Sequence, residues 1–73
     1  FSDAESNYLT AIAIEPGFKE AHLNLGIVYD LYMGRLEDAV VQYEIYLGLV
    51  PEGDKKVSQW VGEIKRRIKQ QAN

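Results

Sequence analysis

A pattern that returns after 35 residues constrains this chain more than any other feature. Six positions near the start, Ala4, Tyr8, Ala11, Ile12, Ile14 and Pro16, are matched in order by Ala39, Tyr43, Tyr46, Leu47, Leu49 and Pro51. A unit of this length with two helices is too small to bury its own apolar faces, so it must stack on similar units. The 73 residues are enough for one small domain built in this way.

Proline and glycine divide the chain into four predicted helices, over residues 2–15, 18–32, 36–49 and 55–71. The breaks between them are Pro16-Gly17, Gly34 and Pro51-Glu52-Gly53. Proline lacks a backbone N–H, and glycine suits the left-handed end of a helix. Apolar residues return every three or four positions within each segment. The sequence therefore predicts an all-α fold in which neighbouring helices run antiparallel.

The apolar positions of each segment predict its inward face. In the second helix they are Ala21, Leu25, Val28, Tyr29 and Tyr32. In the third they are Leu36, Ala39, Val40, Tyr43, Tyr46, Leu47 and Val50. The last helix has one narrow stripe, Val57, Trp60, Val61, Ile64 and Ile68. A helix that is apolar on one side only is typical of a terminal element.

Gly26 lies beside the stripe of the second helix, in the interior of the helix. Glycine in such a position costs roughly 1 kcal/mol relative to alanine. Close approach of a neighbouring helix is the usual compensation, so we expect another helix to pack against Gly26. The last helix contains a similar pair, Val61-Gly62, which can stand in for Leu25-Gly26.

The composition leaves little room for catalysis or metal binding. The chain has no cysteine, and His22 is its only histidine, so no disulfide or metal site is predicted. No nucleophile–base pair, glycine-rich phosphate loop or paired carboxylate site is recognisable, so we expect a non-enzyme without a cofactor. No apolar run approaches the roughly 20 residues of a membrane span, and no signal peptide is visible. These features predict a soluble protein, and they leave open whether its compartment is the cytoplasm or a bacterial cell envelope.

The spacing resembles the tetratricopeptide repeat (TPR) family, through Leu25-Gly26, Tyr29, Gly34, Ala39, Tyr43 and Pro51. The resemblance implies that residues 1–73 form a single domain of an α-solenoid with about one and a half repeats. Residues 1–16 would be the second helix of a partial repeat, residues 18–51 a complete repeat, and residues 54–71 a C-terminal capping helix.

The chain departs from the family pattern at three places. His22 stands where a large apolar residue is preferred, and we expect it to be half-buried at the start of a helix. Tyr29 and Gly34 are one residue further apart than usual, which predicts a lengthened turn around residues 32–34. Tyr46 replaces an alanine, which predicts looser or shifted helix packing there.

TPR domains typically bind proteins, so the resemblance implies an adaptor or assembly scaffold that holds a peptide or partner helix in a concave groove. The groove residues that it implies are Glu20, Leu23, Asn24, Ile27, Asp30, Leu31, Lys56 and Trp60, continued by Gln59, Glu63 and Arg67. Asn24 is the most suggestive, because its amide can both donate to and accept from a ligand's main chain. Asn24 with Lys56 would also be a fragment of a carboxylate clamp, although Ile27 is apolar where such clamps are often polar.

Two alternatives remain open. Trp60 fits either the core, packed on Tyr43 and Leu47, or the groove, as an aromatic anchor for a partner.

The first helix has no preceding helix, so Phe1, Leu9, Ile12 and Ala13 are expected to form an apolar patch through which copies of the chain associate.

Charge is unevenly distributed, and this asymmetry favours a second possible function. Residues 1–52 hold nine acids and two bases, whereas residues 53–73 hold two acids and six bases. A basic last helix on an acidic body is consistent with binding to an anionic surface or to nucleic acid. Affinity that falls steeply with salt would distinguish this alternative from groove binding.

Overall fold

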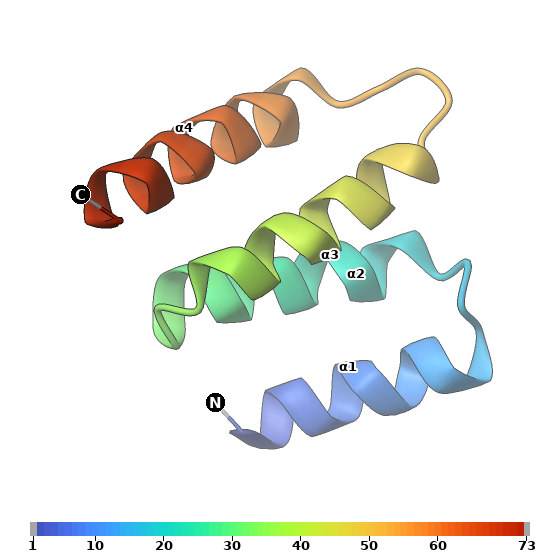
Figure 1. Cartoon of the computed structure of the whole chain (residues 1–73). Coiled ribbons are helices and arrows are strands. Elements are labelled where there is room, and N and C mark those ends of the chain that lie inside the picture. Colours follow the sequence, from blue (N-terminus) through green and yellow to red (C-terminus); the bar gives the residue numbers. More distant parts are fainter. Residues whose placement is uncertain (1, 73) are drawn as a thin grey trace.

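The computed structural model describes residues 2–72 and contains only helices and the turns between them. The helices are α1 (Ser2–Ile14), α2 (Lys19–Ile27), α3 (Leu36–Gly48) and α4 (Lys55–Gln71), with a π-helical turn, η1 (Val28–Tyr32), that continues α2. Consecutive helices alternate in direction and pack on one another, α1 on α2, α2 on α3 and α3 on α4 (Figure 1). The all-helical fold and three of the four predicted helices are therefore confirmed to within one residue.

The second predicted helix is not regular throughout, because its last five residues are wound as a π-helix. The N–H of Met33 donates to the carbonyl oxygen of Val28 at 3.1 Å, five residues back. Gly34 then ends the helix with a φ of +64°. The additional residue between Tyr29 and Gly34 is thus accommodated inside the helix, in a wider turn, and not in a longer loop.

The core lies between α2, α3 and α4. Its buried apolar residues are Ala21, Leu25, Val28, Tyr29, Leu36, Ala39, Val40, Tyr43, Tyr46, Val50, Val57, Val61 and Ile64. The prediction for Tyr32 was wrong, since 56% of this residue is exposed. The wide turn of η1 rotates the residues that follow it, so the regular helical spacing that placed Tyr32 inward no longer applies.

Gly26 is in contact with the ring of Tyr43, which confirms the expected close approach. A Cβ added to Gly26 would lie 2.6 Å from two carbons of that ring. Tyr43 is 1% exposed, its hydroxyl donates to Asp30, and its ring lies 5.7 Å from the ring of Trp60. The ring therefore has little freedom to move away from α2.

His22 is buried, at 4% exposure, and not half-buried as its polarity suggested. Its Nε2 lies 2.8 Å from the carbonyl oxygen of Pro16, and its Nδ1 lies 2.8 Å from Oε1 of Gln42. Both ring nitrogens thus have polar partners, which makes burial of the imidazole acceptable. His22 ties the turn that follows α1 to α2 and to α3.

A polar cluster holds the start of α1 against η1. The hydroxyl of Tyr29 donates to Glu5 at 2.8 Å, and the guanidinium of Arg35 donates to the same carboxylate at 3.0 Å. Arg35 also lies 4.5 Å above the centre of the Tyr29 ring and bonds Asp38. Burial and the neighbouring Glu5 carboxylate raise the pKa of Tyr29. Because α1 has no fully buried residue, this cluster contributes to fixing its position.

The start of α4 is joined to α3 through Asp54. Its carboxylate accepts from the N–H of Val57 at 3.2 Å, which caps the helix, and from the hydroxyl of Tyr46 at 2.8 Å. Tyr46, in which a bulky ring replaces the expected alanine, is buried and links the two helices through this bond. The Tyr46 hydroxyl, together with the backbone N–H groups, lowers the pKa of Asp54 below its usual value near 3.8.

We predict an acid-sensitive contribution from Asp54. A carboxyl whose pKa is lower in the folded state stabilises the fold above its unfolded pKa, and that stability is lost as the pH falls through the folded pKa. Urea unfolding measured from pH 6 down to about pH 2 should therefore show a steeper loss of stability below about pH 4 in the parent chain than in Asp54→Asn. Equal pH profiles for the two proteins would contradict this assignment.

Candidate functional site

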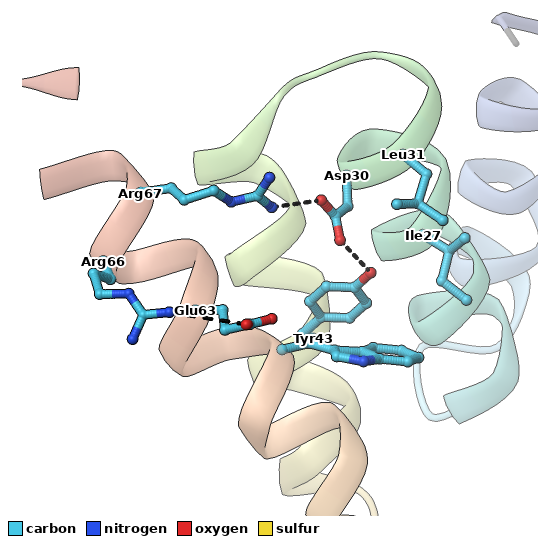
Figure 2. A pocket seen from close by; sticks show the side chains of 8 residues that line it. Ile27, Asp30, Leu31, Tyr43, Glu63, Arg66 and Arg67 are labelled. Atoms are coloured by element: carbon cyan, nitrogen blue, oxygen red, sulfur yellow. Dashed lines mark hydrogen bonds and ion pairs between the residues drawn. The ribbon is translucent and has the colours of Figure 1, made fainter. Parts of the chain in front are cut away.

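A groove of about 450 Å³ opens between η1 and α4. Ligand sites in proteins typically have volumes in the range of about 300–1,000 Å³. Four elements, α2, η1, α3 and α4, supply the lining residues, which are Ile27, Asp30, Leu31, Tyr43, Trp60, Glu63, Arg66 and Arg67. Figure 2 shows α4 on one side of the groove and Ile27, Asp30 and Leu31 on the other.

One part of the groove is apolar. Tyr43 and Trp60 pack on each other with their rings tilted by 51°. Ile27 and Leu31 lie one turn apart on the opposite wall (Figure 2). Leu31 is 69% exposed, which is unusual for a large apolar side chain beside a groove. A surface that combines an exposed leucine with an aromatic pair is suited to an apolar group of a partner.

The other part of the groove is charged, and Asp30 is at its centre. The guanidinium of Arg67 donates to one oxygen of Asp30 at 3.2 Å, and the hydroxyl of Tyr43 donates to the other at 3.3 Å (Figure 2). Burial, with the Asp30 carboxylate beside it, raises the pKa of Tyr43, so the hydroxyl stays protonated as a donor at neutral pH. The bond to Arg67 links η1 to α4 across the groove.

The sequence placed eleven residues on a groove surface, and the structure brings six of them together. Ile27, Asp30, Leu31, Trp60, Glu63 and Arg67 line the cavity. The other five, Glu20, Leu23, Asn24, Lys56 and Gln59, lie outside it; Leu23 is half-buried against the core and the other four are exposed. Trp60 was predicted to lie either in the core or in the groove, and it does both: it packs on the core and also lines the groove.

Two lining residues were not among the predicted ones. Tyr43 was assigned to the core by its helical spacing, and one face of its ring is indeed packed on Gly26. Arg66 lies on the charged side of α4, where spacing alone does not distinguish a groove residue from a solvated one. The 36-residue offset between Leu25-Gly26 and Val61-Gly62 also relates Asp30 to Arg66, and this offset could have placed Arg66 at the groove.

Half of the basic residues near the C-terminus are paired with acids of this chain. Lys65 contacts Glu44 at 2.9 Å, Arg67 contacts Asp30 at 3.2 Å, and Arg66 lies 3.8 Å from Glu63. Lys55, Lys56 and Lys69 are exposed. Internal pairing of this kind reduces the positive potential that α4 presents to an anionic partner.

Within residues 2–72, no group of three or more metal-ligating side chains is placed to hold an ion. Over the same residues, none of the helices has the length and apolar character needed to cross a membrane. Comparison of the sequence with protein-family models and with curated proteins, and of the structure with solved structures, found no match.

Proposed function

We propose that this chain is a non-catalytic protein-interaction module of the tetratricopeptide-repeat type, acting as an adaptor or assembly scaffold. Two observations support the repeat interpretation. The 35-residue pattern spans the first and third helices, and the glycine of the proposed complete repeat packs on the tyrosine of that repeat. Each helix packs mainly on its neighbours in sequence, and helices of such an array leave their remaining faces available to partners.

The groove between η1 and α4 is the proposed binding site for a peptide or a partner helix. The observation that carries this proposal is the exposed side chain of Leu31, which faces a groove with Tyr43 and Trp60 at its centre. An apolar side chain of the partner would lie between Leu31 and Trp60. Arg66 and Glu63, which are exposed at the rim, would contact the polar groups that flank it.

The basic C-terminal helix provides the alternative, binding to an anionic surface or to nucleic acid. It has less support, because three of its six bases are paired within the chain. Affinity for a mixed-sequence oligonucleotide that falls steeply with salt would favour it.

A selection of random 12-residue peptides on the immobilised chain tests the groove. Trp60 is the only tryptophan, so its fluorescence reports directly on binding of the selected peptides. We expect Leu31→Asp to weaken their binding by at least about tenfold, which corresponds to loss of one apolar contact of about 1.4 kcal/mol. Val41→Asp is the matched control, because Val41 is 51% exposed but lies on α3 and does not line the groove.

The two variants separate groove binding from general adhesion. Selected peptides should bind Val41→Asp as tightly as the parent chain and should change Trp60 fluorescence. Peptides that lose affinity equally for both variants, or for neither, would show that the groove is not the binding site.

A further inference from the structure

No contact within residues 2–72 explains why position 62 is a glycine. Gly62 lies in the middle of α4, is exposed, and a Cβ added to it would meet nothing within 4 Å. Glycine is among the poorest helix formers, and nothing in the described part of the chain compensates for it here. A glycine inside an exposed helix is explained if the backbone of another element, or a ring, approaches it.

Gly26 shows which kind of group approaches a glycine in this fold. Gly62 follows Gly26 by 36 residues, as Val61 follows Leu25. The ring that rests on Gly26 belongs to Tyr43, in the next helix along the chain. The residue that corresponds to Tyr43, 35 positions earlier, is Tyr8 in α1. Within residues 2–72, no ring packs on Gly62 as Tyr43 packs on Gly26. Tyr8 is the counterpart of the ring that is missing there.

α1, in turn, has a face that no other helix of the described chain covers. It has no fully buried residue, and its inward positions, Tyr8 among them, are only half-buried against α2. Ile14, which corresponds to Leu49, is 81% exposed. The residue that corresponds to Gln42 is Asn7, and it is exposed. α2 thus covers one side of α1. The other side of α1, which corresponds to the side of α3 that packs on α2, is open.

We propose that copies of this chain associate head to tail, with α1 of one copy packed antiparallel on α4 of the next. Tyr8 would rest on Gly62 as Tyr43 rests on Gly26, and the two helices together would form a complete helical pair. The second copy is the occupant that the 35-residue correspondence specifies, because it carries the matching residues in the required order. This inference rests on the repeat interpretation of the proposed function.

The charges of the two helices are complementary in this arrangement. Residues 1–18 hold three acids and no base, whereas α4 holds six bases and one acid. Glu5 is paired with Arg35, and Lys65, Arg66 and Arg67 are paired with acids of the same chain. The charges left for the contact are Asp3 and Glu15 near α1 and Lys55, Lys56 and Lys69 in α4. Antiparallel packing places the end of α4, with Lys69, beside the start of α1, with Asp3. Opposite charges at matching ends favour this orientation over a symmetric contact between two α1 helices, which would bring acids together.

Such a contact is heterologous, because each copy uses two different surfaces. Heterologous contacts produce rings or open chains of molecules rather than closed dimers. Sedimentation velocity of the 73-residue chain at increasing concentration is therefore expected to show species that grow beyond the dimer, and that diminish when salt is raised. A single monomeric species up to the millimolar range, at low salt, would overturn the proposal.

Gly62→Leu gives effects of opposite sign for the monomer and for the assembly. Leucine is a better helix former, so the Tm measured at low concentration should rise by about 4–8 °C. The added side chain would occupy the place of Tyr8, so association should weaken at least about tenfold. A variant that is more stable yet associates as strongly as the parent chain would overturn the assignment of Gly62 to the contact.

A cysteine pair tests the register. His22 and Gln42 are bonded to each other, and their counterparts are Ser58 and Asn7, both exposed. The chain has no native cysteine, so Ser58→Cys and Asn7→Cys proteins can be mixed and oxidised cleanly. We expect disulfide-linked dimers in that mixture, and few when Ser6→Cys, one position further round α1, replaces Asn7→Cys.

The outcomes distinguish this inference from the groove. Dimers formed by Asn7→Cys alone would indicate a symmetric contact between α1 helices and would overturn the head-to-tail arrangement. Equal cross-linking by Ser6→Cys would overturn the register. In either case peptide binding through Leu31 is measured separately, at concentrations where the chain is monomeric, so failure of one proposal does not imply failure of the other.

Discussion

Gly26→Ala is expected to destabilise the chain by about 1–3 kcal/mol, even though alanine favours a helix by roughly 1 kcal/mol. The added methyl group would lie 2.6 Å from two ring carbons of Tyr43, well inside normal contact distance. The ring is 1% exposed and is held by its bond to Asp30 and by its contact with Trp60. Overpacking must therefore move α2 and α3 apart.

The same substitution at Gly62 provides the matched control. Gly62→Ala adds the same methyl group to a helix interior, but there nothing lies within 4 Å of it. We expect Gly62→Ala to stabilise the monomer by up to about 1 kcal/mol, because only the helix preference changes. Urea unfolding at low protein concentration measures both effects. Changes of the same sign at the two glycines would contradict the packing of Tyr43 on Gly26.

The helices could be predicted from the sequence because their ends are marked by residues with strong backbone preferences. Pro16-Gly17 and Gly53 interrupt the helical pattern, and Asp54 caps the helix that follows. Gly34 and Gly53 both have positive φ values, a conformation that glycine adopts at low cost. Such signals act locally, so they do not depend on how the helices are arranged.

The π-helical turn could not be predicted in this way. Compared with the repeat pattern that the sequence resembles, the spacing between Tyr29 and Gly34 predicts one added residue, but that residue can be accommodated in the loop or in the helix. A wide turn costs helical hydrogen-bond geometry, and the contacts that compensate for it come from elsewhere in the chain. Here Asp30, inside η1, bonds Tyr43 and Arg67, and Tyr29 bonds Glu5.

The groove was predictable in part. Ile27, Asp30, Leu31 and Trp60 follow from the resemblance to a repeat family, and they do line one cavity. The resemblance could not exclude Asn24 and Lys56, because which residues line a groove depends on where α4 rests on α3. That position is set by the apolar stripe of α4 and by pairs such as Lys65 with Glu44.

His22→Ala is expected to destabilise the chain by about 2–4 kcal/mol. The substitution removes a buried ring and leaves a cavity, which alone accounts for much of this loss. It also removes two polar contacts, to Pro16 and to Gln42, each worth about 0.5–1.5 kcal/mol. Asn24→Ala, two residues further on the exposed side of α2, is the matched control and should change stability little.

Gln42→Ala separates the two contributions of His22. It removes one of the two polar partners but leaves the imidazole ring and its bond to Pro16, so the expected loss is only about 1 kcal/mol. In the double variant, loss of His22 should make the effect of Gln42→Ala much smaller, because the two residues share one contact. Fully additive losses in urea unfolding would mean that His22 stabilises the fold by filling space and not by joining α2 to α3.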